Sequence, residues 1–348
     1  MLVDRVRWRA ASGIVAGALL AISVTVVAGT PAQADPGSLP LSETTVTGIH
    51  NTYAAPYTYL AQALDAGAQM IELDTWDDVL TQEWKVSHSD PTGNQNNCVT
   101  ASSPADIYTG SANKDFSACL DDIKYWLQAH PGAGPIYIKV ENKDGFAPSL
   151  GMGPAQFTSY VNNEIGSILY RPSDLLGSYP SLDAAAKANA WPTRSQLAGK
   201  IIMYMINGAV EVDNPLVNPK SEVALATYDQ SLYTSGQFSQ ATTFPAVLNA
   251  ASGDPRTQFA ASLQPYFVFF DGDANTYVTS IDTSFYTNNH YILTMTDAQN
   301  VAPVLDDTNP PVADAQARVA QLAADGASIV SNDWSGLPAV LNETLTRG

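Results

Sequence analysis

The sequence predicts an α/β fold, specifically a single (β/α)8 barrel of the TIM type. Short β-branched or apolar segments alternate with stretches of helical periodicity through most of the chain. Several of these segments end in ionisable or amide residues, and parallel barrels gather their functional side chains at the carboxyl ends of strands. The segments expected to form strands are 45–49, 69–76, 84–88, 136–141, 200–206, 266–270, 291–295 and 327–330.

Helical periodicity lies between these segments. The clearest example is 116–130, where apolar residues recur at helical spacing and Asp115 is a suitable N-cap. The stretches 171–198 and 207–265 show no clear strand pattern, and we expect them to be irregular excursions. The other expected helices are 57–66, 154–168 and 312–324.

The first 34 residues have the pattern of a secretory signal peptide. Three arginines among the first nine residues precede an apolar stretch over 13–29, and Ala32-Gln33-Ala34 fits the small-residue cleavage signal. An uncleaved membrane anchor is the alternative, but the apolar stretch is short for a span. We therefore expect cleavage after residue 34, secretion to the extracellular space, and one catalytic barrel domain over 35–348.

Composition limits the possible partners. The formal net charge of −18 opposes non-specific binding to nucleic acid, because the summed field repels phosphate. The chain has two cysteines, Cys98 and Cys119, and an even count in an exported protein favours a disulfide. Two buried free thiols are the alternative. A zinc site made only of cysteines is excluded by the count.

Two carboxylates share one face of a buried segment. Glu72 and Asp74 lie two residues apart in the apolar run 70–76, so in a strand they point to the same side. Their repulsion and desolvation are unfavourable unless a cation or a proton offsets them. A hard divalent cation with oxygen ligands is the natural offset. The alternative is a pair of acids at a solvated strand end.

Neighbouring strand ends carry further polar groups. His50 and Asn51 follow the first expected strand, and His88 ends the third. In the fourth, Lys139, Glu141 and Lys143 alternate and so share one face. Any single histidine is more often structural than catalytic, but polar groups at four successive strand ends indicate a site at the barrel mouth.

Six of these residues resemble, in order and type, the catalytic pattern of calcium-dependent phosphatidylinositol-specific phospholipases C, most closely the small secreted bacterial members. The resemblance covers about residues 44–143. It implies that one asparagine and three carboxylates bind Ca2+, and that the two histidines are catalytic. The implied metal ligands are Asn51, Glu72, Asp74 and Glu141, and the implied catalytic residues are His50 and His88.

The resemblance also implies the reaction. Phosphatidylinositol in membranes or micelles would be cleaved to diacylglycerol and a cyclic inositol phosphate, with His88 as general acid. Any of the three carboxylates could be the general base. Lys139 and Lys143 are candidate contacts to phosphate or the inositol ring, although solvated lysines are equally consistent with the sequence. Trp334 could pack on the ring or simply cap the barrel.

The resemblance is incomplete on the substrate side. The segment 200–206 lacks the basic pair that reads ring phosphates in the eukaryotic enzymes, which favours plain phosphatidylinositol. We expect a monomer that contacts membranes peripherally. A glycerophosphodiester phosphodiesterase is the nearest rival, but that family typically begins with His-Arg-Gly where this chain has His50-Asn51-Thr52. A sphingomyelinase D-like enzyme and a non-catalytic calcium-stabilised binding module are weaker alternatives.

Overall fold

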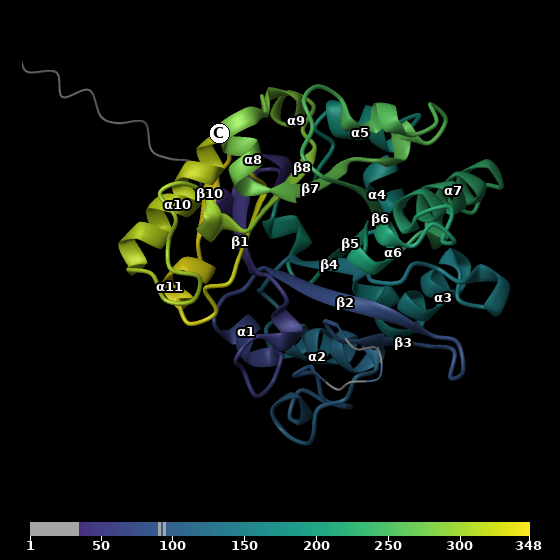
Figure 1. Cartoon of the computed structure of the whole chain (residues 1–348), viewed down its shortest axis with the longest axis horizontal. Helices are drawn as coiled ribbons and strands as arrows, with labels where there is room; N and C mark the ends of the chain where they lie inside the picture. Colours follow the sequence, from purple (N-terminus) through teal and green to yellow (C-terminus); the bar gives the residue numbers. More distant parts are fainter. Residues whose placement is uncertain (1–34, 90–91, 93–94) are drawn as a thin grey trace, which may run out of the picture. The chain divides into compact units, whose positions relative to one another are not determined.

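Eight parallel strands close into a barrel in the computed structural model, which describes residues 35–89, 92 and 95–348 (Figure 1). The expected signal peptide over 1–34 therefore lies outside the described residues. Around the barrel the order is β1-β9-β8-β7-β6-β5-β4-β2, and β2 pairs back with β1. The barrel strands are β1 (Thr44–Ile49), β2 (Met70–Asp78), β4 (Ile136–Asn142), β5 (Ile201–Asn207), β6 (Phe244–Leu248), β7 (Phe269–Asp273), β8 (Ile292–Thr296) and β9 (Ile329–Asn332).

The fold class predicted from the sequence is confirmed, but one predicted barrel strand is wrong. β3 (Glu83–Val86) lies outside the barrel and pairs antiparallel with β2. The turn between β2 and β3 is too short for the crossover that a parallel pair requires. The missing barrel strand is β6, inside the stretch predicted to be irregular. Pro245 within this five-residue strand explains why its pattern is weak.

Another short strand, β10 (Thr344–Thr346), pairs antiparallel with β1. Helices surround the barrel, and several of them fall inside the two excursions predicted to be irregular (Figure 1). No helix in the described part of the chain is long and apolar enough to span a bilayer. The helices are α1 (Ala61–Asp65), α2 (Phe116–Ala129), α3 (Pro154–Ile165), α4 (Pro172–Leu176), α5 (Leu182–Lys187), α6 (Ala209–Asp213), α7 (Ser221–Thr234), α8 (Ala274–Ser280), α9 (Ser284–Asn288), α10 (Val312–Ala324) and α11 (Pro338–Leu341).

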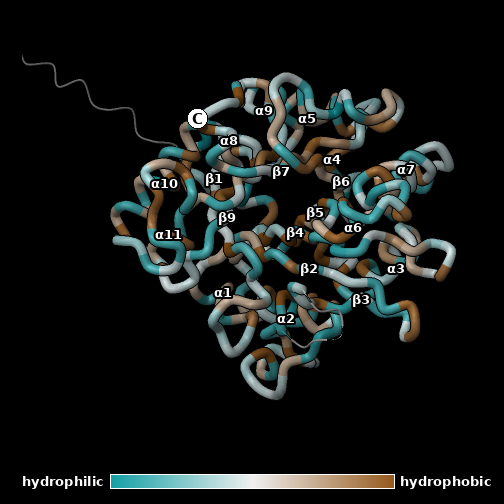
Figure 2. Tube along the Cα trace, viewed as in Figure 1, coloured by the Kyte–Doolittle hydropathy of each residue, from teal (hydrophilic) through white to brown (hydrophobic). Residues whose placement is uncertain are grey.

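Aromatic side chains fill the barrel below its polar mouth. Tyr204 of β5 stacks on Phe269 of β7 with ring centroids 5.1 Å apart, and Phe244 of β6 lies 4.9 Å from Phe269. The Tyr204 hydroxyl hydrogen-bonds Thr294 Oγ1 at 3.0 Å. Figure 2 shows the hydrophobic character of these central strands. This layer supports the polar groups at the carboxyl ends of the strands.

The Cys98–Cys119 disulfide is present, as predicted. It joins the segment after β3 to the first turn of α2, with a Cα–Cα distance of 4.9 Å. Asn97, next to Cys98, donates from its side chain to the backbone oxygen of Thr52 at 3.1 Å. The disulfide therefore anchors a segment that contacts the loop following β1.

Candidate active site

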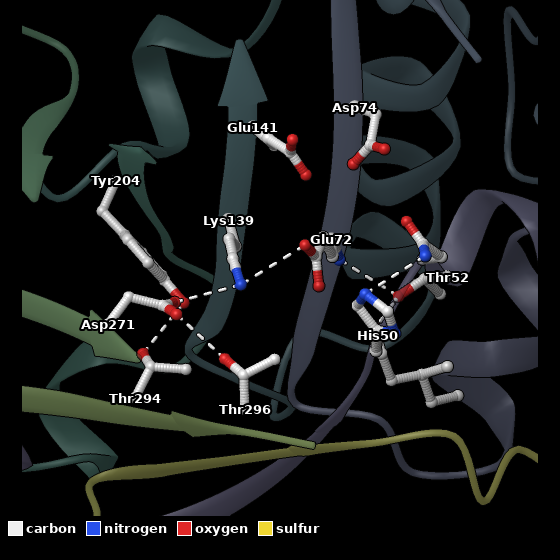
Figure 3. Close-up of polar contacts among 12 residues, drawn as sticks. His50, Thr52, Glu72, Asp74, Lys139, Glu141, Tyr204, Asp271, Thr294 and Thr296 are labelled. Atoms are coloured by element: carbon white, nitrogen blue, oxygen red, sulfur yellow. Dashed lines mark hydrogen bonds and ion pairs between the residues drawn. The ribbon is translucent and has the colours of Figure 1, made fainter. Parts of the chain in front are cut away.

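Strand register brings four of the predicted site residues together at the carboxyl ends of β2 and β4. β2 and β4 pair so that Glu72 lies beside Lys139 and Asp74 beside Glu141. The four side chains point toward one another from adjacent strands (Figure 3). This register depends on barrel closure, whereas the two-residue alternation within each strand was readable from the sequence.

Glu72, Asp74 and Glu141 form a compact carboxylate cluster. One oxygen of each lies within 4.8 Å of the others. Glu72 is 1% exposed and Asp74 is fully buried. Within the described part of the chain, Glu72 Oε2 and Asp74 Oδ1 are buried without a hydrogen-bond partner, so both could accept a ligand. Burial, together with the charges of Glu141 and Glu72, raises the pKa of Asp74 to about 7.

Asn51 reaches the same cluster through Tyr53. Asn51 has a left-handed backbone conformation, φ 49°, immediately after β1. The Tyr53 hydroxyl lies 3.0 Å from Asn51 Oδ1 and 2.8 Å from Asp74 Oδ2. Thr52 adds a second link, because its Oγ1 accepts from the backbone N–H of Glu72 at 3.1 Å. Sequence reasoning assigned no role to Tyr53 or Thr52, although both directly follow His50 and Asn51 in the chain.

His50 is held by an acid that sequence reasoning missed. Its Nδ1 lies 3.1 Å from Asp333 Oδ1, and its Nε2 lies 3.2 Å from the Asn51 amide nitrogen. Burial alone would lower the pKa of His50, but the hydrogen bond with Asp333 and the charge of Glu72 raise it to about 9. The available signal was the position of Asp333 directly after the last barrel strand.

Both candidate lysines are paired with acids. Lys139 is 2% exposed, and its Nζ lies 3.3 Å from Glu72 Oε1 and 3.1 Å from Asp271 Oδ2 (Figure 3). Burial opposes its charge, but Asp271 and Glu72 raise the pKa of Lys139 well above its usual value. Thr296 completes this group by donating to Asp271 Oδ1 at 2.9 Å.

Lys143 has two carboxylate neighbours in the cluster itself. Its Nζ lies 3.0 Å from Asp74 Oδ2 and 3.0 Å from Glu141 Oε1. These contacts raise the pKa of Lys143, although burial works in the opposite direction. Neither lysine is the solvated side chain that the sequence left open as an alternative.

Two cavities hold the predicted site residues, and members of the carboxylate cluster line the second. The first, the His88 cavity, has a volume of about 560 Å³, and His88 is exposed there. Asn51, Tyr53 and Tyr57 line the same cavity. The second, the Asp271 cavity, has a volume of about 260 Å³. Its lining combines the apolar side chains of Ile206, Ala209, Val212 and Leu248 with the polar side chains of His50, Glu72, Lys139, Glu141, Asn207, Asn249, Asp271, Asp273, Thr296 and Asp297.

Trp334 lies away from both cavities. Its side chain is fully buried in the core, and its Nε1 donates to the backbone oxygen of Asp306 at 3.0 Å. In this conformation the indole has no exposed face on which a ring could stack. The placement favours the role that the sequence left as the alternative, a cap on the barrel.

Known proteins resemble this chain over most of its length. The family model described as "Phosphoinositide phospholipase C, Ca2+-dependent" matches residues 53–343. A solved Ca2+-dependent phosphatidylinositol-specific phospholipase C from Streptomyces antibioticus is 46% identical, with 89% of this chain and 99% of that chain covered and a TM-score of 0.86.

A calcium-dependent phosphoinositol-specific phospholipase C from Pseudomonas sp., solved with myo-inositol, is more distant. It shares 21% identity over 91% of this chain and 99% of that chain, with a TM-score of 0.65, which supports the fold. No curated protein sequence matches significantly.

Proposed function

Because the chain belongs to the Ca2+-dependent phosphoinositide phospholipase C family, we propose that it cleaves phosphatidylinositol to diacylglycerol and inositol 1,2-cyclic phosphate. The observation that carries this proposal is the carboxylate cluster of Glu72, Asp74 and Glu141, which shares a cavity with His50, while His88 and Asn51 line a second cavity. Such a cluster suits a phosphodiester, whose cleavage develops negative charge that fixed cations and donors must stabilise.

The residues of the cluster fit a calcium ion. Ca2+ takes oxygen ligands from carboxylates and amides, and two buried carboxylate oxygens here lack a partner. Asn51, Glu72, Asp74 and Glu141 would hold the ion. When bound, Ca2+ would offset charge on the phosphoryl oxygens and lower the pKa of a hydroxyl that it contacts.

The two histidines would act on opposite sides of the phosphate. His50, held by Asp333 and with a raised pKa, would donate to a phosphoryl oxygen in its protonated form. A carboxylate of the cluster would take the proton of the inositol 2-hydroxyl as its oxygen bonds to phosphorus. His88 would give a proton to the glycerol oxygen as the bond between that oxygen and phosphorus breaks.

The preferred substrate would be plain phosphatidylinositol. Among the described residues that line the Asp271 cavity, the cations are His50 and Lys139, and Lys139 is already paired with two acids. The predicted absence of a basic pair on β5 agrees with its structure, since Met203, Tyr204 and Met205 are fully buried. Phosphates on the inositol ring would therefore find no uncommitted lysine or arginine in this lining.

Exposed apolar side chains suggest how the enzyme meets a membrane. Leu80, in the turn between β2 and β3, is 92% exposed, and Leu216, in the segment after α6, is 90% exposed. Leu150, Val210 and Val212 are also exposed and also follow barrel strands. The hydrophobic tip of the β2–β3 turn is visible in Figure 2. We propose that these side chains contact lipid peripherally, since they follow the strand ends that carry the site.

Export and a monomeric state complete the proposal. Signal-peptide cleavage after residue 34 would release the chain extracellularly, and the Cys98–Cys119 disulfide is typical of oxidising compartments. All the proposed site residues come from one chain, so a monomer could be catalytically complete.

The product of the purified exported protein tests the function. Vesicles of phosphatidylinositol are incubated with protein in Ca2+ or in excess chelator, and the soluble products are followed by 31P NMR. We expect inositol 1,2-cyclic phosphate in Ca2+ and none in chelator. Turnover in chelator would contradict the metal requirement. A non-cyclic first product would instead indicate a phosphodiesterase that uses water as the nucleophile.

A further inference from the structure

The Asp271 cavity contains two carboxylates that have not been assigned a role. Asp273 ends β7, and Asp297 follows β8. Among the described residues, neither has a lysine, arginine or histidine nitrogen within 4.0 Å, whereas Glu72, Glu141 and Asp271 are each paired with a lysine. At longer range the charges of His50, within 4.8 Å, and of Lys139 act on Asp297.

Local structure fixes both carboxylates at the cavity. Asp273 is the N-cap of α8, and its Oδ1 accepts from the backbone N–H of Thr276 at 2.7 Å and from Thr276 Oγ1 at 2.5 Å. Asp297 has a left-handed backbone, φ 59°. The N-cap hydrogen bonds therefore hold the exposed Asp273 carboxylate, and the left-handed turn sets the backbone position from which Asp297 reaches the cavity.

The cavity suits the inositol ring better than the lipid portion of the substrate. Its volume of about 260 Å³ is below the roughly 300–1,000 Å³ of cavities that take drug-sized ligands, and two amides and the Thr296 hydroxyl line it beside the carboxylates. The His88 cavity, of about 560 Å³, mixes aromatic with amide side chains, among them Tyr57, Gln95 and Asn97, and its larger volume leaves more room for the glycerol ester side. The proposed proton donor to the glycerol oxygen, His88, lies in that second cavity.

We propose that Asp273 and Asp297 determine specificity for an unphosphorylated inositol ring. An ionised carboxylate only accepts hydrogen bonds, and a ring hydroxyl can donate to it. A ring phosphate is also an acceptor and an anion, so it would repel the same carboxylates at close range. Selectivity against a phosphorylated ring thus depends on repulsion by these carboxylates as well as on the lack of an uncommitted lysine or arginine in the described cavity lining. This inference rests on the proposed function.

The two carboxylates can be neutralised with little change in shape. Asparagine is as good an N-cap as aspartate, so Asp273→Asn should retain the start of α8. Asparagine also tolerates positive φ, so Asp297→Asn should retain its turn. Asp282→Asn is the matched control, because Asp282 is an exposed acid that accepts from Ser284 N–H at 2.9 Å and does not line the cavity. All three variants change the net charge equally.

The experiment measures kcat/KM for phosphatidylinositol and for its 4,5-bisphosphate in phosphatidylcholine vesicles at equal mole fractions and saturating Ca2+. We expect Asp273→Asn and Asp297→Asn each to raise the bisphosphate-to-phosphatidylinositol ratio roughly tenfold, the effect of removing one close repulsion. Asp282→Asn should leave the ratio unchanged. Ratios that stay at the wild-type value in both cavity variants, or that rise equally in the control, would overturn the inference.

A second measurement covers a variant that loses turnover. For wild type and each active variant, binding of soluble inositol 1,4-bisphosphate is measured as inhibition of phosphatidylinositol cleavage. For an inactive variant, binding of the same compound is measured by calorimetry. Tighter binding to the cavity variants alone supports the inference, and equal binding contradicts it. Failure of the wild-type protein to cleave phosphatidylinositol would instead reject the proposed function, so the two failures are distinguishable.

Discussion

Replacing Lys139 by methionine would show whether this residue contacts the substrate or supports the site. The Lys139 side chain is 3% exposed and its ammonium is shared between Glu72 and Asp271, at 3.3 Å and 3.1 Å. Methionine keeps much of the apolar volume and removes the charge. Two buried carboxylates would then lose the cation between them, which is unfavourable at this depth.

The size of the effect follows from this geometry. Removing one partner of a buried ion pair typically lowers the free energy of unfolding by about 3–5 kcal/mol. With an unfolding entropy of about 2 cal/mol/K per residue and roughly 300 residues, Tm should fall by about 5–8 °C. The double variant Lys139→Met/Asp271→Asn removes one charge of each sign and should recover part of the loss.

The assay is calorimetry of wild type, the two single variants and the double variant in chelator, together with KM for phosphatidylinositol in Ca2+. We expect a coupling between Lys139 and Asp271 in the unfolding free energy. An unchanged Tm in Lys139→Met, combined with a raised KM, would refute this reasoning. That result would instead make Lys139 a contact to phosphate or the inositol ring, which is the role that the sequence suggested for it.

Three further predictions concern the site and the core. His50→Ala and His88→Ala should each lower kcat roughly a hundredfold or more with unchanged circular dichroism, and near-normal turnover would exclude the assigned role. Lys143→Met should tighten Ca2+ binding in calorimetry, because its ammonium lies 3.0 Å from two proposed ligands; equal or weaker binding would count against this. Asp229 of α7 is fully buried, its two oxygens lack partners, and burial raises its pKa well above 3.8. Its folded form therefore binds a proton that the unfolded form releases, so stability should fall as pH rises above about 4, and Asp229→Asn should flatten this dependence in urea unfolding at pH 5 and 8.

Local pattern was enough to find the carboxylate cluster. Glu72 and Asp74 lie in an apolar segment, and the two-residue period of a strand places them on one face whatever their neighbours are. Glu141 lies two residues from Lys139 and Lys143 by the same rule. The Asp271 partner of Lys139 could not be read this way, because Asp271 approaches Lys139 only after β7 takes its place in the closed barrel.

The sequence predicted the correct number of barrel strands, although one of the eight predicted segments lies outside the barrel. The segment around Trp84 has a strand pattern but pairs as a hairpin, while β6, with its internal proline, has little pattern and completes the barrel. Strand propensity describes a segment that fits a pleated surface and does not say which sheet position it takes. One barrel strand was predicted in error and one was missed, so the predicted number of strands and the fold class were still correct.

The partner of His50, Asp333, could not be predicted from residues near either one in the sequence. His50 and Asp333 are separated by nearly the whole described chain, and they meet because β1 pairs with β9 in a register that sets Ile49 opposite Asn332. The residue following each strand then falls at the same height on the rim. Any acid in that position would face the histidine, so Asp333 could be chosen only by knowing that the last strand closes on the first. Closure is a property of all eight strands together, and a side-chain pair that depends on it leaves no periodic signal near either residue.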